Sequence, residues 1–145
     1  MDTLTAGFSN WKMIDGGNTW EIELTRGMTF HNGEKWDAHA AAYSINYLDD
    51  CEDCNPPKEI GESYAKVIDD YTISWHVQQG HSMLPRYWQY TTFRAPKHHA
   101  DTKFLQPITG ETIGWGPYKF KSFSADNILT IEKFNDYYDN PNIFL

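Results

Sequence analysis

Three aromatic side chains and one arginine lie close together in the second half of the 145-residue sequence: Trp88, Tyr90, Phe93 and Arg94. Aromatic walls with a single guanidinium suit a peptide or a carboxylate-bearing chelate, because arginine grips a carboxylate through two parallel hydrogen bonds. The alternative is that the rings belong to the core and that Arg94 forms an ordinary surface ion pair. We take these four residues as the candidate ligand contacts.

Two cysteines, Cys51 and Cys54, flank two acidic residues and form the most unusual local motif of the chain. This spacing is compatible with a disulfide, with half of a zinc site, or with a thioredoxin-like redox pair. The acidic neighbours disfavour the thiolate that a redox pair needs. A zinc site needs four ligands, and the sequence has no second cysteine pair. In an extracellular protein a local disulfide is the favoured interpretation, with two free thiols as the alternative.

The six histidines give only weak support for acid–base chemistry. His31 falls in a predicted turn and His76 on the polar face of a predicted strand, while His98 and His99 are expected to be solvated on a helix. The sequence has no G-x-S-x-G, H-E-x-x-H or phosphate-binding glycine loop. We therefore expect neither enzymatic activity nor a cofactor.

Charge and composition limit the classes of protein to which the chain can belong. The net charge is −8, and the twelve basic residues are spread without a run of three, which argues against nucleic-acid binding. Aromatic residues make up 16 % of the chain and charged residues 22 %, as expected for one globular domain over residues 1–145. No apolar run is long enough for a transmembrane helix, and no signal peptide is visible at the start of the sequence.

The first half of the chain is predicted to begin with a polar lead-in over residues 1–18. Alternation of Trp, Ile and Leu with Glu and Thr then predicts a half-buried strand at residues 20–25. Met28 and Phe30 are expected to continue the sheet, before a turn in which Gly33 takes a positive φ.

Asp37 is the predicted N-cap of a helix over residues 38–48. Ala41, Ile45 and Leu48 fall on one face of that helix. We expect this face to pack on the sheet.

The second half is predicted to hold two antiparallel hairpins and two short helices. The hairpins pair residues 64–68 with 71–77 and residues 118–123 with 128–134. The helices span residues 82–90 and 96–104. The predicted fold class is α+β, with an antiparallel or mixed sheet and two or three helices.

Six short motifs follow one another along most of the chain. They are the strand T-W-E-I-E-L-T-R, the turn G-M-T-F-H-N-G, Tyr43-Ser44, Asp69-Asp70-Tyr71-Thr72, G-W-G-P-Y-K at residues 114–119, and E-K-F-N-D-Y-Y at residues 132–138. Together they resemble the extracellular solute-binding proteins of bacterial ABC importers, in the family 5 class for oligopeptides, dipeptides and nickel complexes. The chain departs from that pattern at Trp115, where the family has a small residue.

The resemblance implies one lobe of a periplasmic-binding-protein-like fold, since those proteins are several times longer than this chain. It implies capture of a small solute between two lobes, followed by docking of the closed form on a membrane permease. It also implies an extracellular or periplasmic location, with tethering to the membrane through a missing N-terminal region. The segment that contains Arg94 would then approach the cleft.

Two other interpretations belong to different classes. A free-standing interaction module would present Trp and Tyr on its surface, because such rings are enriched at recognition sites. A metal-stabilised domain would be built on Cys51 and Cys54.

Overall fold

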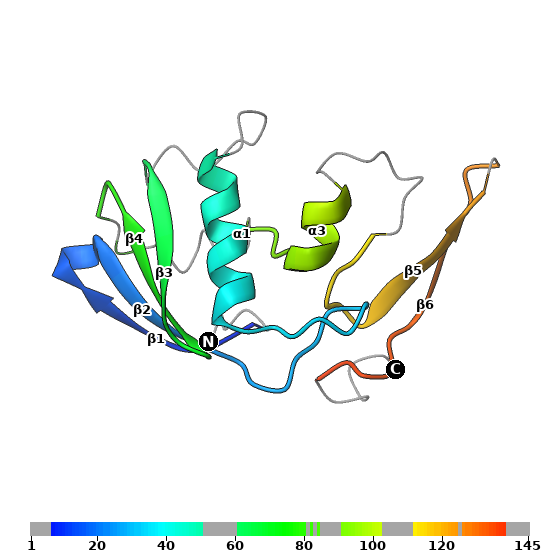
Figure 1. Ribbon diagram of the computed structural model, residues 1–145, viewed down its shortest axis with the longest axis horizontal. Helices are drawn as coiled ribbons and strands as arrows, with labels where there is room; N and C mark the ends of the chain where they lie inside the picture. Colours follow the sequence, from blue (N-terminus) through cyan, green and yellow to red (C-terminus); the bar gives the residue numbers. More distant parts are fainter. Residues whose placement is uncertain are drawn as a thin grey trace. The chain divides into compact units, whose positions relative to one another are not determined.

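The computed structural model describes residues 7–50, 61–80, 82, 84, 91–102, 112–124 and 126–138. Two compact units make up the chain, one from residues 1–26 and 37–93 and the other from residues 27–36 and 94–145. We call them unit 1 and unit 2 (Figure 1). That residues 1–145 form one domain stays a prediction.

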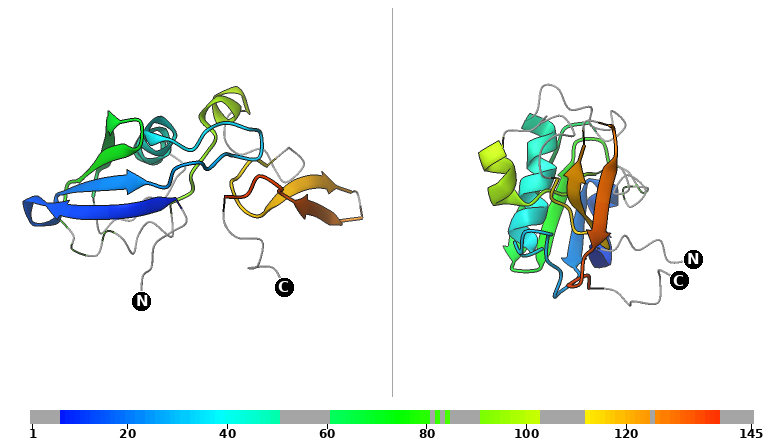
Figure 2. Two further views of the ribbon diagram at one scale, coloured as in Figure 1. Left: turned by 90° about the horizontal axis from the view of Figure 1, so that it is seen from below. Right: turned by 90° about the vertical axis from the view of Figure 1, so that its right-hand side faces the viewer.

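Unit 1 is built on a four-stranded antiparallel sheet in the order β1-β2-β4-β3. Its strands are β1 (Phe8–Ile14), β2 (Thr19–Leu24), β3 (Ser63–Asp69) and β4 (Thr72–Val77). Helix α1 (Ala38–Asp50) lies along one face of the sheet and packs mainly on β3 (Figures 1 and 2). The predicted α+β class is confirmed.

The core of unit 1 follows from the two-residue alternation in β2 and β4. Trp20 pairs with Trp75 and Ile22 pairs with Ile73, and each of the four side chains is at most 4 % exposed. Paired residues of antiparallel strands point to the same face, so the two strands bury one common apolar surface. The predicted half-buried strand is thus confirmed. The first predicted hairpin is confirmed as well, because β3 pairs antiparallel with β4.

Helix α1 begins where the sequence predicts. The Asp37 side chain accepts a hydrogen bond of 3.0 Å from the Ala40 N–H, as an N-cap does. Ala41 and Ile45 are buried, while the Leu48 side chain lies outside the described part of the chain. The Asn46 amide bonds both the N–H and the carbonyl of Ala65, which ties the helix to β3.

The predicted polar lead-in is wrong over Phe8–Ile14, which forms strand β1 at the edge of the sheet. Only Phe8 of its side chains is buried, and a bulge separates Phe8 from Asn10, so the strand carries no clean alternation. The turn that follows, η1 (Asp15–Gly17), has positive φ values at all three residues. Pairing with β2, rather than its own pattern, makes this segment a strand.

The prediction that Met28 and Phe30 continue the sheet is also wrong. Gly27 has a φ of 81° and turns the chain after β2, so both residues belong to unit 2. There Thr29 forms an isolated bridge with Lys35, and Gly33, with a φ of 83°, closes the turn as predicted.

Unit 2 contains helix α3 (Pro96–Thr102) and the hairpin of β5 (Tyr118–Phe123) and β6 (Leu129–Lys133). The second predicted hairpin is confirmed, and α3 starts at the predicted proline. Most of the helix predicted over residues 82–90 lies outside the described residues. Among the helices that the structure describes, none is long and apolar enough to cross a membrane.

Candidate functional site

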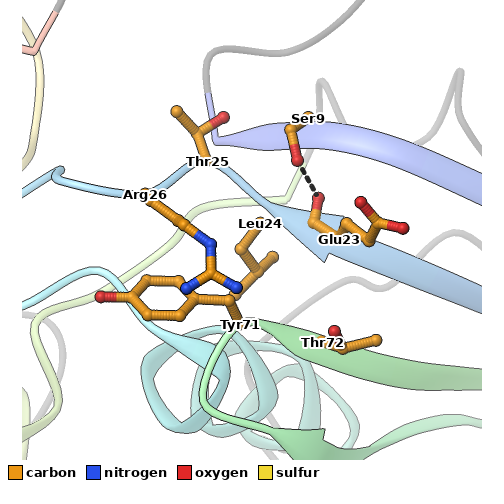
Figure 3. A pocket seen from close by; sticks show the side chains of 7 residues that line it. All are labelled: Ser9, Glu23, Leu24, Thr25, Arg26, Tyr71 and Thr72. Atoms are coloured by element: carbon orange, nitrogen blue, oxygen red, sulfur yellow. Dashed lines mark hydrogen bonds between the residues drawn. The ribbon is translucent and has the colours of Figure 1, made fainter.

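A pocket of about 290 Å³ opens in unit 1 beside the ends of β2 and β4 (Figure 3). It is lined by Ser9, Glu23, Leu24, Thr25, Arg26, Tyr71 and Thr72. Backbone hydrogen bonds fix its walls, because Leu24 N–H donates to the Tyr71 carbonyl at 2.8 Å and Thr25 N–H donates to the Gly7 carbonyl at 3.0 Å. The pocket thus lies where three strands are joined.

Arg26 is the cation of this pocket. Its guanidinium carbon is 4.4 Å from the centre of the Tyr71 ring, and Figure 3 shows the guanidinium lying over that ring. This arrangement is a cation–π contact, and it orients the planar group while leaving N–H donors at its edge. The Ser9 hydroxyl donates to the Glu23 carbonyl at 3.2 Å on the far side of the pocket.

One acidic residue near Arg26 is Asp69. The Tyr71 N–H donates to the Asp69 carboxylate at 2.8 Å. This bond and one from the Thr72 side chain lower the pKa of Asp69, with a smaller contribution from the charge of Arg26. The pocket exposes one guanidinium and several hydroxyl groups, but none of its lining residues is a histidine or cysteine that could move a proton at neutral pH.

A second cluster, in unit 2, surrounds the turn before β5. The His31 N–H donates to the Gly114 carbonyl at 2.7 Å, and the Gly114 N–H donates to His31 Nδ1 at 3.2 Å. His31 Nε2 lies 2.9 Å from the Gly116 carbonyl. Because Nδ1 accepts, the ring is the neutral tautomer that carries its proton on Nε2. One histidine therefore holds both glycines of the G-W-G-P turn.

Trp115, between those glycines, packs in an aromatic cluster. Its ring stacks on Phe30 at 6.0 Å and meets Trp36 edge-on at 4.2 Å. Phe30 and Trp36 are both 0 % exposed. The large side chain at this position thus serves packing within unit 2.

Glu34 joins the same turn to helix α3. Its carboxylate accepts the N–H groups of Lys97 at 2.9 Å and His98 at 3.1 Å, and the Asn32 side chain donates to it at 2.7 Å. Partial burial acts to raise the pKa of Glu34, but the bonds from Lys97, Asn32 and His98 outweigh it and the net shift is downward. Glu34 therefore caps a helix far from it in the sequence.

The predicted ligand contacts are only partly described. Phe93 is 8 % exposed and packs edge-on against Phe8 at 5.4 Å in unit 1. Arg94 is 7 % exposed, so the alternative of a surface ion pair is wrong for it. Trp88 and Tyr90 lie outside the described residues. That these four residues contact a ligand stays a prediction.

Of the remaining residues singled out in the sequence, some are described by the structure and others are not. Cys51 and Cys54 lie outside the described residues, so their disulfide also stays a prediction. His99 is 8 % exposed, and the expectation that it is solvated is wrong. Burial, then the charges of Arg94 and His98, lower the pKa of His99. Within the described part of the chain, no group of three His, Cys, Asp or Glu side chains could hold a metal ion.

Sequence reasoning missed the roles of Arg26, His31 and Glu34. Arg26 closes the T-W-E-I-E-L-T-R motif, and the other two lie in the turn that follows. The sequence held one indication of these roles. This turn and the G-W-G-P motif both belong to the family pattern that the chain resembles, which suggests that they lie close together.

Comparison with known proteins gives concordant results. The family model of the bacterial extracellular solute-binding proteins, family 5 middle, matches residues 8–143. A curated relative, the glutathione-binding protein GsiB of Salmonella paratyphi A, is 22 % identical over 130 residues, which cover 88 % of this chain and 25 % of GsiB. The chain thus spans about a quarter of the length of this relative.

Two solved structures share the fold. The oligopeptide-binding protein AppA of Bacillus subtilis, in complex with a nonapeptide, matches with a TM-score of 0.74 and 20 % identity, over 93 % of this chain and 28 % of AppA. NikZ of Campylobacter jejuni, in complex with Ni(L-His), matches with a TM-score of 0.71 and 17 % identity, over 90 % of this chain and 27 % of NikZ.

Proposed function

Because the chain belongs to the bacterial extracellular solute-binding proteins of family 5, we propose that it is a segment of a receptor that captures a small solute for an ABC importer. The observation that carries this proposal is the family match over residues 8–143, which includes both compact units. The receptor would act outside the cytoplasmic membrane, tethered to it through an N-terminal region, and would deliver its solute to a membrane permease.

The proposed solutes are peptides and nickel chelates. The names of the similar proteins support both classes, since they include a glutathione-binding protein, a nonapeptide complex and a Ni(L-His) complex. Both kinds of solute carry carboxylates, for which a guanidinium is the best-matched side chain. Arg94, with Trp88, Tyr90 and Phe93, remains our proposed contact set, in which Arg94 would bind a solute carboxylate.

In this receptor the 145-residue chain supplies mainly scaffold. Solute capture would need a second wall from the rest of the polypeptide, because the chain spans only 25–28 % of the similar proteins named above. Closure of two walls on a solute would give the permease a shape to recognise.

Calorimetric titration of the full-length receptor with short peptides and with nickel–histidine tests this proposal. We expect one solute class to bind, and the Arg94→Lys variant to bind it at least about tenfold more weakly, because lysine cannot form the bidentate pair. Lys12→Gln is the control, since it removes an exposed positive charge on β1, away from the residues considered for binding, and should leave the affinity unchanged.

Three results would contradict the proposal. Failure of the full-length receptor to bind either class would remove the proposed solutes. Equal affinity of the Arg94→Lys and wild-type receptors would remove Arg94 from the site. Tight solute binding by the 145-residue chain alone would show that no second wall is needed.

A further inference from the structure

The pocket beside the ends of β2 and β4 has a cationic side and an anionic side. Arg26 and Glu23 both line it, and in Figure 3 the guanidinium of the first and the carboxylate of the second lie on opposite sides of Leu24. Both charged side chains are exposed, so a molecule from the solvent can reach them. The pocket therefore offers one positive and one negative group to the same small ligand.

The guanidinium of Arg26 is held in place and still keeps its hydrogen-bond donors. Its carbon lies 4.4 Å from the centre of the Tyr71 ring, and this contact uses only the flat face of the group. In the part of the chain that the structure describes, the guanidinium forms no hydrogen bond and no ion pair. The N–H donors at its edge can therefore bind a carboxylate through two parallel hydrogen bonds.

The backbone that carries the two charged residues is fixed from both sides. The Leu24 N–H donates to the Tyr71 carbonyl at 2.8 Å, which holds β2 at a position between Glu23 and Arg26. On the side of β1, the Ser9 hydroxyl donates to the Glu23 carbonyl at 3.2 Å. A ligand would therefore meet a preorganised backbone, and its binding would not have to order a loop.

Charge and volume together select the class of ligand. A simple anion would be attracted by Arg26 but repelled by Glu23 and by Asp69, whose charge also acts on Arg26. A simple cation would be repelled by Arg26. A molecule with one ammonium and one carboxylate satisfies both sides of the pocket. The volume of about 290 Å³ is at the lower end of the range for ligand pockets, about 300–1,000 Å³, and suits a ligand of amino-acid size.

We propose that this pocket is a second binding site of the protein and takes a free α-amino acid as its zwitterion. The Arg26 guanidinium donates two hydrogen bonds to the carboxylate of the amino acid, and the Glu23 carboxylate accepts a hydrogen bond from its ammonium group. The hydroxyls of Thr25 and Thr72 line the same pocket. The inference goes beyond the proposed function, because this site lies within unit 1, whereas the solute site needs a second wall.

L-Alanine and two of its fragments test the class of ligand in the full-length protein. Propionate is alanine without its ammonium group, and ethylamine is alanine without its carboxylate. Calorimetric titration should show L-alanine binding at least about tenfold more tightly than ethylamine, which cannot use the guanidinium, and severalfold more tightly than propionate. L-Alanine should also slow amide hydrogen exchange at residues 23–26 and 71–72, which locates its binding in the pocket.

Substitutions that remove one charge separate the two contacts. Arg26→Gln should weaken L-alanine binding at least about tenfold, and Arg26→Lys, which keeps the charge but not the planar fork, should also weaken it. In Glu23→Gln, L-alanine and propionate should bind about equally, because the group that distinguishes them is gone. Lys12→Gln and Glu21→Gln are the matched controls. These two residues pair with each other outside the pocket lining, and their variants should leave the affinity unchanged.

Three results would overturn the inference. Unchanged exchange at residues 23–26, up to the solubility limit of L-alanine, would show that the pocket does not bind it. Equal affinity of the wild type for propionate and L-alanine would mean that only a carboxylate is recognised. L-Alanine binding that survives both Arg26 substitutions would place the amino acid elsewhere in the protein. None of these results bears on the solute site, which the Arg94→Lys variant tests, so the proposed function can stand or fall separately.

Discussion

The β3–β4 hairpin of unit 1 and the β5–β6 hairpin of unit 2 differ in what their neighbours supply. Ile73 and Trp75 of β4 are at most 2 % exposed because β2 pairs with that strand and α1 covers the sheet. Leu129 and Ile131 of β6 are more than half exposed, and the two strands form a sheet of their own. Alternation thus specifies which face of a strand is apolar, whereas neighbouring elements decide whether that face is buried.

The two helices make a parallel comparison. Helix α1 is capped by Asp37, the residue directly before it, with a bond to Ala40. Helix α3 is capped by Glu34, whose carboxylate accepts the N–H groups of Lys97 and His98. The cap of α1 is thus a residue next to it in the sequence, whereas the cap of α3 is a residue that is distant in the sequence and is brought close by the fold.

The largest expected effect comes from removing the aromatic cluster that supports unit 2. Trp36→Ala should lower the free energy of unfolding by about 3–5 kcal/mol, because it deletes a fully buried ring that contacts Phe30 and Trp115. Native-state hydrogen exchange should then show lost protection in β5 and β6. The amides of β2 and β4 are the internal reference, and equal loss there would show that the two units unfold together.

Smaller losses of stability are expected when either of two histidines is replaced, and the two losses should differ. His31→Ala should cost about 1–3 kcal/mol, because Gly114 N–H and the Gly116 carbonyl both lose a partner. His76→Ala in unit 1 should cost about 1 kcal/mol or less, since its partners are the Thr19 and Ser74 hydroxyls, which can bond water instead. Urea unfolding of both variants measures the contrast, and equal losses would remove the special role of His31.

The two caps should be nearly equivalent in energy despite their different origins. Asp37→Ala and Glu34→Ala should each cost about 0.5–2 kcal/mol, the usual range for loss of an N-cap. Hydrogen exchange should localise the first loss to α1 and the second to α3. Unchanged protection of α3 in Glu34→Ala would show that the distant carboxylate does not stabilise that helix.

The smallest expected effect is the dependence of stability on pH. Burial, and then the charge of Lys66, lower the pKa of His76, with an opposing effect of Asp15, and burial lowers the pKa of His99. The unfolded chain therefore binds more protons than the native one in this range. Stability should be fully present above the ordinary histidine pKa of about 6.5 and should fall as the pH drops through it.

Glu34 should add a second loss at lower pH. Its native pKa is lowered, so its contribution is present above the ordinary glutamate value and is lost as the pH falls through the native value. Thermal midpoints of the wild type and Glu34→Gln across pH 3–8 measure this step, because the amide variant cannot titrate there (about 4.3 is the ordinary glutamate pKa). Identical pH profiles would contradict the assignment.

Local sequence patterns specify the periodic strands and the start of the first helix in this protein. Trp20, Ile22 and Leu24 specify β2, and Asp37 specifies the start of α1, because alternation and capping act over a few residues. The ordered motifs also indicated the family, which the family model confirms over residues 8–143. These features need no knowledge of distant contacts.

Other features depend on contacts between residues that are far apart in the sequence. Phe8–Ile14 is a strand because β2 pairs with it, and Phe30 leaves the sheet because Gly27 turns the chain. His31 is hydrogen-bonded to Gly114, and Arg26 forms a cation–π contact with Tyr71. Both pairs are too far apart in the sequence for a local pattern to predict them. Side chains of this kind acquire their partners from the fold, because hydrogen bonds and ring contacts depend on position in space and not on spacing along the chain.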